Sequence, residues 1–259
     1  YGVKKGSTKI IKSQIHQLLD KLPFTSSVKF NGIILPPKCR RWCGPEFRDD
    51  DYFFQSAILE AKRLKFEFGI KNNDNILDIG CGFGRLPIGL NKIFDSINYI
   101  GIDVHRPSID WCKKFLSKNT SQLNFIHFNI KNERYNEDGN KFGDDFKFPI
   151  DSKSQDLIYL YSVFSHMRIE EMRKYFIDFK RIIKKNGKLF FTAFVEKNVS
   201  DYSINPKGYI FEEFSGPLHV VRYDFDFLLN ELKIAGFKIE KIFESTETDK
   251  QTGLYLSQS

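Results

Sequence analysis

The chain is poor in cysteine, tryptophan, methionine and long apolar runs. Its 259 residues include 4 Cys, 2 Trp and 2 Met, and so few cysteines exclude the disulfide framework of small secreted domains. Cys39 and Cys43 have C-x₃-C spacing, but no second pair follows at zinc-finger distance, so we expect reduced thiols and no metal. No window approaches the roughly 20 apolar residues of a membrane span, and the N-terminus lacks a signal-peptide core. We therefore expect a cytoplasmic protein with no membrane partner.

What the chain has instead is the composition of a globular protein built on phenylalanine. It contains 27 Phe, and its 41% hydrophobic and 15% aromatic residues exclude general disorder. Its length predicts one large domain, or one domain with an added cap. Because the chain starts at Tyr1 and not at Met, we expect it to be a piece of a longer protein with an additional domain.

The net charge of +7 is concentrated near the N-terminus. Residues 1–50 hold 10 Lys and Arg against 4 Asp and Glu, whereas residues 51–259 hold 30 against 29. The larger part therefore lacks the broad basic field of a nucleic-acid-binding protein, and we expect no nucleic-acid partner. We expect residues 1–50 to form a cationic lid over a catalytic domain at 51–259. This lid is expected to select an acidic substrate such as a carboxylate.

Hydrophobic periodicity predicts strands that alternate with helices from residue 75 onward. This alternation is typical of an α/β protein with a doubly wound, mostly parallel sheet, here with an antiparallel edge because the last two strands have no helix between them. Asn186-Gly187 is expected to end a helix. The expected strands are 75–79, 98–103, 124–130, 156–163, 188–195, 237–244 and 252–258; the expected helices are 8–21, 54–68, 85–95, 106–117, 168–185 and 225–236; segments 22–50, 131–151 and 196–222 are expected to be irregular.

The most informative motif is the glycine loop Asp78-Ile79-Gly80-Cys81-Gly82-Phe83-Gly84, directly after the first of these strands. Ligands of doubly wound folds bind at such strand ends. The dinucleotide motif G-x-G-x-x-G fails because Arg85 stands at its last position, and no P-loop is present. A carboxylate at Asp78 would repel a pyrophosphate, but it suits the sulfonium and ammonium groups of S-adenosylmethionine (SAM).

A second acid, Asp103, ends the next strand and lies 19 residues after Gly84. A carboxylate near this offset accepts hydrogen bonds from ribose hydroxyls. The alternative is that Asp103 caps the helix that follows. Loop, acid and spacing together predict a cofactor that contains adenosine.

These residues resemble the class I SAM-dependent methyltransferases, a Rossmann-like family. The resemblance is carried by NILDIGCGFGRLPIGL, YIGIDVHRPSIDWCKKFL, FPIDSKSQDLIYLYSVFSHM and FKRIIKKNGKLFFTAF, in the order of the family. The shorter motifs G-P-E-F, I-D-W-C, N-E-R-Y-N-x-x-G and S-V-F-S-H-M are similar to a bacterial subgroup of small-molecule methyltransferases. The resemblance covers about residues 44–258. It implies a seven-stranded sheet of order 3-2-1-4-5-7-6 with an antiparallel strand 7, SAM as cofactor and S-adenosylhomocysteine as product.

The resemblance also assigns roles to single positions. It places the methionine part of SAM at the glycine loop, the ribose at Asp103, and the adenine between the ends of the second and third strands. The implied cofactor set is Asp78, Gly80, Cys81, Gly82, Gly84, Arg85, Asp103, Val104, Asn129, Ile130, Tyr161 and Ser162.

Methyl transfer to a hydroxyl or an ammonium group requires a base, whereas a carboxylate acceptor requires none. His166 follows the fourth strand on the side of the methyl group, so it is the first candidate; the alternative is that it caps or packs the helix at 168–185. His219 is the second candidate, and Arg222 and Tyr223 share its loop as candidates for substrate contact.

The N-terminal segment supplies candidates for a lid. Trp42, Tyr52 and their aromatic neighbours can exclude water from the pocket. Arg40, Arg41 and Arg48 are either structural or bind an anionic substrate group through both guanidinium nitrogens.

These observations predict an enzyme that methylates an oxygen or a nitrogen of a small molecule or of a peptide-derived natural product. The alternatives are an RNA methyltransferase, or the SAM-binding domain of a larger multidomain enzyme. The tetrapeptide N-P-P-Y/F of amino-group nucleic-acid methyltransferases is absent after the fourth strand, where Tyr161-Ser162-Val163-Phe164 stands, and this counts against base methylation.

Overall fold

The computed structural model describes residues 26–42, 44–119, 122–143 and 145–259. The helix expected at 8–21 lies outside the described residues, as does Cys43. Among the described residues, no helix is both long enough and apolar enough to cross a membrane.

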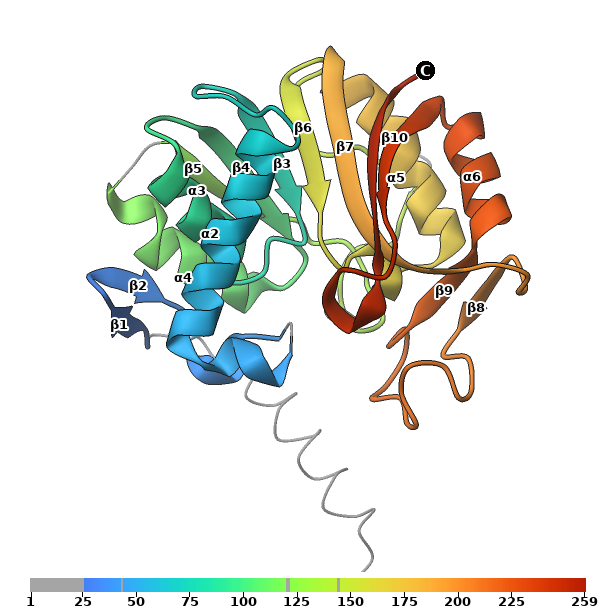
Figure 1. The fold of residues 1–259 in the computed structure, drawn as a ribbon, viewed down its shortest axis with the longest axis horizontal. Helices are drawn as coiled ribbons and strands as arrows, with labels where there is room; N and C mark the ends of the chain where they lie inside the picture. The colour runs from blue at the N-terminus through green and yellow to red at the C-terminus, as the bar shows by residue number, and fades with distance from the viewer. Residues whose placement is uncertain (1–25, 43, 120–121, 144) are drawn as a thin grey trace, which may run out of the picture.

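The core of the molecule is a sheet whose main path has the order β10-β11-β7-β6-β3-β4-β5 (Figure 1). Counted along the chain, these seven strands read 3-2-1-4-5-7-6. The last of them pairs antiparallel with both of its neighbours, while the first five pair parallel to one another. The expected fold class is thus confirmed. The strands are β3 (Asn75–Ile79), β4 (Asn98–Asp103), β5 (Leu123–His127), β6 (Gln155–Leu160), β7 (Ile183–Glu196), β10 (Phe237–Phe243) and β11 (Thr252–Gln258).

Helices cover both faces of this sheet, because successive strand residues point to opposite sides. One apolar cluster joins Ile76 and Leu157 to α2 (Asp50–Phe66), α3 (Arg85–Ile93) and α4 (Arg106–Phe115). The other cluster joins Leu77 and Ile158 to α5 (Ile169–Ile182) and α6 (Phe225–Ile234). The parallel strands run in one direction, so all their carboxyl ends meet at a single edge.

Segment 22–50 was expected to be irregular, but its described part contains a hairpin of β1 (Val28–Phe30) and β2 (Ile33–Leu35). Asn31 and Gly32 connect the strands with φ angles of 47° and 75°, as an Asn-Gly turn requires. Two 3₁₀ turns follow, η1 (Lys38–Arg40) and η2 (Pro45–Arg48). A small apolar cluster of Leu35, Phe47, Phe53, Ala57 and Ile88 packs this segment onto α2 and α3.

One other segment is also more ordered than expected. Segment 196–222 includes β8 (Tyr202–Ile204) and the start of β9 (Val221–Asp224), and β9 pairs with β7 in parallel, so the sheet gains two short strands. The described part of segment 131–151 is irregular as expected, and its Phe146 and Phe148 pack on Tyr175 of α5. Figure 1 shows β1, β2, β8 and β9 at the same end of the sheet.

Several predicted element ends were wrong. Helix α5 ends at Ile182 and β7 begins at once, so Asn186-Gly187 lies within a strand. The carbonyls of Arg181 and Ile182 accept hydrogen bonds from the loop before β6, and Ile183 pairs with Gln155. Strands β5 and β6 each end three residues early, at His127 and Leu160.

Candidate functional site

The glycine loop lies at the carboxyl end of β3. Gly80, Gly82 and Gly84 have φ angles of 75°, 51° and 74°, which L side chains rarely adopt. A Cβ on Gly80 would lie 2.4 Å from Val163, whereas a Cβ on Gly82 would meet no heavy atom within 4 Å. The loop therefore packs closely on one side and faces open space at Gly82. Burial raises the pKa of the Cys81 thiol, which keeps it protonated and unreactive.

Asp103 is joined directly to this loop. Its Oδ2 accepts a hydrogen bond from the Gly82 amide at 2.8 Å, and its Oδ1 accepts one from the His105 amide at 2.8 Å. Burial raises the pKa of Asp103, although these amides act in the opposite direction. The cap of α4 is His105, whose Nδ1 accepts from the Ser108 amide, so the capping alternative for Asp103 was wrong. A carboxylate has about four lone-pair sites, so after the amides of Gly82, His105 and Val104 one remains for a hydroxyl.

Asp78 lies beneath the loop and is 3% exposed. The Tyr99 hydroxyl donates a 2.6 Å hydrogen bond to its carboxyl group. Burial raises the pKa of Asp78 to about 7, against the effects of the Tyr99 hydrogen bond and of the Arg85 charge. The carboxyl group therefore changes charge near neutral pH.

Arg85, the residue directly after the glycine loop, lies near Tyr161 and Phe47. The Arg85 guanidinium carbon is 4.9 Å from the Tyr161 ring centroid and 5.7 Å from that of Phe47 in the lid. The Tyr161 hydroxyl is 3.1 Å from Thr248 Oγ1. An arginine is thus held between the lid and the end of β6, directly after the glycine loop.

Ser162 is part of a polar network that the sequence did not predict. Its amide donates to Thr192 Oγ1 at 2.8 Å, and its hydroxyl accepts from Gln251 Nε2. Thr192 in turn donates to Gln251 Oε1 at 2.8 Å. Ser162 follows β6, Thr192 lies in β7 and Gln251 directly precedes β11, so only the strand order brings them together and no local signal could have identified Thr192 or Gln251.

Val104, Asn129 and Ile130 lie together near the ends of β4 and β5. His127 Nε2 is 3.1 Å from the Val104 carbonyl. The Asn136 side chain donates to Asn129 Oδ1 and to the Ile130 carbonyl, both at 3.0 Å. Their proposed role beside the adenine remains a prediction.

Trp42 meets Tyr135 above the glycine loop. The Trp42 ring centroid is 5.4 Å from Phe83, 5.0 Å from His105 and 6.2 Å from Tyr135, whose ring is nearly parallel. The lid and the loop after β5 therefore approach each other across the site. Tyr135 was missed as a candidate, although it lies in the motif N-E-R-Y-N.

His166 packs between this loop and the segment before β9. Its ring is 5.7 Å from that of Tyr135, and its Nδ1 is 3.0 Å from the Leu218 carbonyl, to which it donates in the neutral ring. Burial and the Arg134 charge lower the pKa of His166 to about 3. The ring is therefore neutral at physiological pH and is a weak proton acceptor.

His219 lies within the insertion itself. Its Nδ1 accepts from the Ser215 amide at 3.1 Å, and its ring stacks on Phe211 at 4.8 Å. Burial lowers its pKa. These contacts hold the insertion in shape, and a catalytic role for His219 remains a prediction.

Tyr223 was predicted to contact substrate, and this was wrong. Its ring is fully buried, and its hydroxyl donates to the carbonyls of Phe164 and Met167 at 3.0 and 3.1 Å. It therefore holds the turn that carries His166. The neighbouring Arg222 on β9 forms an ion pair with Glu196 at 2.8 Å, and its guanidinium lies over the Tyr209 ring. Its charge is therefore paired within the protein.

The arginines of the lid do not form one cationic surface. Arg41 is buried; it donates to the carbonyls of Pro36, Phe47 and Asp49 and pairs with Asp50 at 2.8 Å, so its role is structural. Arg40 is also buried, and burial lowers its pKa. Arg48 is exposed. Tyr52 is about half exposed, with its ring edge on Phe47.

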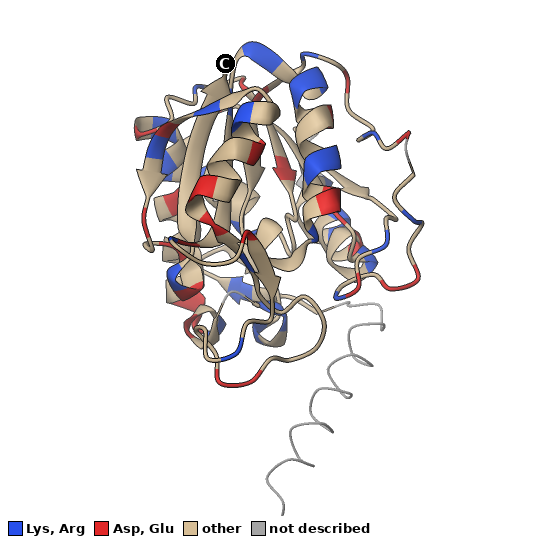
Figure 2. Ribbon diagram, turned by 90° about the vertical axis from the view of Figure 1, so that its right-hand side faces the viewer, with Lys and Arg blue, Asp and Glu red and all other residues tan. Residues whose placement is uncertain are grey.

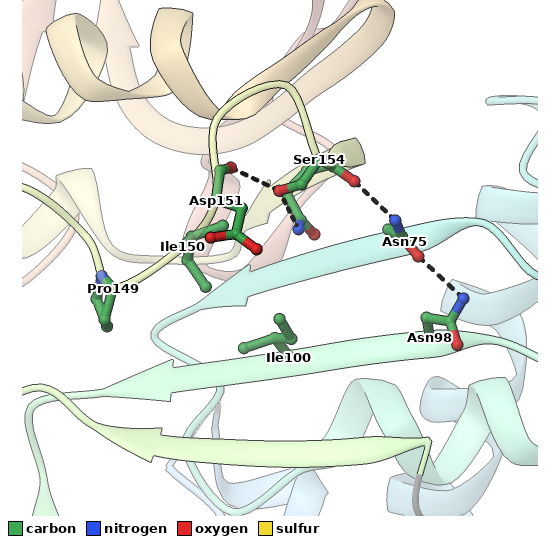
Figure 3. Close-up of a pocket in the computed structure, with 8 residues that line it drawn as sticks. Asn75, Asn98, Ile100, Pro149, Ile150, Asp151 and Ser154 are labelled. Carbon is green, nitrogen blue, oxygen red and sulfur yellow. Dashed lines mark hydrogen bonds between the residues drawn. The ribbon is translucent and has the colours of Figure 1, made fainter.

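A separate cavity lies at the opposite edge of the sheet. Its volume is about 290 Å³, and Asn75, Asn98 and Gln155, each the first residue of a strand, line it (Figure 3). Asn75 donates to the Ser154 carbonyl and accepts from Asn98. No candidate site residue lines this cavity. Within the described part of the chain, no cluster of three or more His, Cys, Asp or Glu residues could hold a metal ion.

Residues 77–189, which contain the glycine loop and Asp103, match the family model described as a methyltransferase domain. Residues 77–189 therefore form a methyltransferase domain, and its strand order and glycine loop are those expected of the class I SAM-dependent methyltransferases. The glycine loop and Asp103 fit SAM as the cofactor. The open space at Gly82 adjoins the Asp103 carboxylate, which can accept a further hydrogen bond from a ribose hydroxyl.

Solved methyltransferases share this fold. A SAM-dependent methyltransferase from Aquifex aeolicus superposes with a TM-score of 0.52 at 17% identity, over 78% of this chain and 91% of that chain. The 1,6-didemethyltoxoflavin N1-methyltransferase of Burkholderia thailandensis gives a TM-score of 0.54 at 12% identity, over 81% of each chain.

A curated relative is an uncharacterized methyltransferase of Schizosaccharomyces pombe, 24% identical over 140 residues, which are 54% of this chain and 46% of the relative. The methyltransferase chain thus spans less than half the length of the curated relatives it matches.

Proposed function

We propose that this protein transfers the methyl group of SAM to an oxygen or nitrogen of a small molecule or of a peptide-derived natural product. The observation that carries the proposal is the enclosure of the strand ends: Trp42 of the lid contacts Tyr135, and Tyr135 contacts His166. Such a roof suits a compact acceptor better than a duplex or a folded RNA.

The cofactor would be held by residues whose contacts are described above. Asp103 would accept from the ribose hydroxyls, the backbone of Gly82 would approach the methionine part, and Asp78 and Arg85 would face its ammonium and carboxylate groups. SAM supplies an activated methyl group, so the protein contributes position and the exclusion of water.

The acceptor would approach from the side of Tyr161 and His166. His166 has a pKa near 3, so it can orient an acceptor but cannot hold a proton at neutral pH. This favours an acceptor that enters with a free lone pair, such as a carboxylate oxygen or a neutral amine. The exposed Arg48 remains the lid arginine that could attract a carboxylate.

The mixture of positive and negative charges on the surface favours a small-molecule acceptor over a nucleic acid. Lysine and arginine are interspersed with aspartate and glutamate over the face in Figure 2. Nucleic-acid binding usually requires a continuous basic groove.

The proposal is tested by incubating the protein with methyl-labelled SAM and, separately, a metabolite extract and total RNA. We expect label in the small-molecule fraction and none with Asp103→Ala. Label in RNA would overturn the proposal.

His166→Ala should reduce the rate by less than about 10-fold if the residue only positions the acceptor; a loss of about 100-fold or more would make it the base.

A further inference from the structure

Helix α2 carries a line of large apolar side chains that face solvent. Tyr52, Leu59 and Phe66 are 47%, 63% and 75% exposed, respectively. They are seven residues apart, so they lie almost directly above one another on the helix. We call these three residues the α2 stripe.

The opposite face of the same helix packs against the protein core. Phe53, Ala57, Ala61 and Leu64 are buried, and α2 packs on α3 so closely that a Cβ on Gly89 would meet the Ala57 carbonyl at 1.9 Å. In Figure 1, α2 runs across the side of the molecule that faces the viewer. The stripe is therefore a second apolar face on a helix that needs only one to hold its place in the fold.

Among the residues that the structure describes, no other large exposed apolar side chains form such a line. Ile177 on α5 and Ile234 on α6 are 71% and 72% exposed, but each stands alone on its helix. Single exposed apolar residues are ordinary, whereas aligned ones mark an interaction surface.

The stripe is complementary to itself in one orientation. Leu59 is its midpoint, so a two-fold rotation about Leu59 reverses the helix and places Tyr52 of one copy against Phe66 of the other. Leu59 then packs on Leu59. This is the arrangement of an isologous contact.

The charges beside the stripe select the same orientation. Asp51 precedes Tyr52 and Lys65 precedes Phe66, so both flank the stripe on one side, and both are exposed. In an antiparallel pair these flanks meet, and Asp51 of each copy faces Lys65 of the other. A parallel pair would bring the two acidic ends together and the two basic ends together.

We propose that the α2 stripe is a self-association surface, where a second copy of this chain binds with its α2 antiparallel. The helix has 17 residues and is about 25 Å long. A contact between two such helices is smaller than the roughly 1,600 Å² of a standard interface. The dimer is therefore weak and dissociates on dilution.

Analytical ultracentrifugation of the full chain, at about 1 to 200 µM, tests this. The weight-average mass should rise toward that of a dimer with concentration. Leu59→Asp should keep the protein monomeric, whereas Ile177→Asp, at an equally exposed position on another helix, should leave the association unchanged. A monomer at all concentrations, or association that is insensitive to Leu59→Asp, would overturn the proposal.

A charge swap tests the orientation. Asp51→Lys and Lys65→Asp alone should each weaken association by about 5-fold, and the two together should restore it. Thermal unfolding of each variant separates these effects from loss of the helix. Failure of the double variant to recover, or a monomer that Leu59→Asp destabilises because its own chain covers the stripe, would contradict the proposal.

Discussion

At the scale of single residues, Asp78 and Asp103 differ in what stabilises their charge. Asp103 accepts hydrogen bonds from backbone amides, among them those of Gly82 and His105, while Asp78 has the Tyr99 hydroxyl as its described hydrogen-bond donor and is almost fully buried. Burial disfavours the charged form, so the pKa of Asp78 rises to about 7. The motif predicted an acid at this place, but its ionisation is set mainly by its burial in the folded sheet and opposed by the Tyr99 hydrogen bond, neither of which local spacing reveals.

We expect SAM to bind more tightly as pH rises through 7. Asp78 is neutral below its pKa and negative above it, and only the negative form attracts the sulfonium and ammonium groups. The dissociation constant, measured by calorimetry, should fall by up to about 10-fold between about pH 6 and pH 8. Asp78→Asn should remove most of this dependence. An unchanged slope in the variant would assign the effect to another group.

The raised pKa of Asp78 also makes the folded protein less stable as pH rises, whereas it makes SAM binding tighter. The folded pKa lies above the unfolded one, so the contribution of Asp78 to the free energy of unfolding is largest at low pH and declines between about pH 4 and pH 7.

At the scale of elements, the 3₁₀ turn η5 (Thr248–Lys250) connects distant parts of the site. Glu247, just before it, pairs with Arg63 of α2 at 2.5 Å, and Arg63 also pairs with Glu60 at 2.7 Å. The Arg63 guanidinium lies 4.6 Å from the Phe190 ring centroid. Through Thr248 and Gln251 the same segment reaches Tyr161 and Ser162. Helix α2 therefore helps to position the end of β6.

Glu247→Gln should lower the free energy of unfolding by about 3 kcal/mol, because it leaves a buried arginine with one carboxylate fewer. Denaturant titration measures this. Glu133→Gln is the control, since its pair with Arg168 is exposed on both sides and should cost less than about 1 kcal/mol. Equal losses in the two variants would refute the structural role of the buried pair.

The elements also show where prediction from sequence succeeds. Repeated apolar runs located the strands of the main sheet, and the family resemblance supplied their order. The β1–β2 hairpin was missed although Asn31-Gly32 marks it. Strand β9 was missed because its pairing with β7 depends on the tertiary structure. The polar network of Ser162, Thr192 and Gln251 could not be predicted from the sequence for the same reason.

At the scale of the whole molecule, the parallel sheet gathers the functional loops at one edge. The lid, the glycine loop, the segment after β5 and the insertion before β9 all meet there, although they are far apart along the chain. The charge count predicted a cationic lid, but Arg41 and Arg40 are buried, and Arg41 is committed to the backbone and to Asp50. The described contact of the N-terminal segment with Tyr135 is therefore aromatic, through Trp42, rather than electrostatic.

The central claim is that the glycine loop and Asp103 form the SAM site of this methyltransferase domain. Calorimetric titration of the full chain with SAM tests it most directly. We expect one SAM to bind per chain, and binding to be lost or at least about 10-fold weaker in Asp103→Ala, with an unchanged unfolding temperature. A folded protein that binds no SAM, or a variant that binds it as tightly as the parent, would contradict the claim.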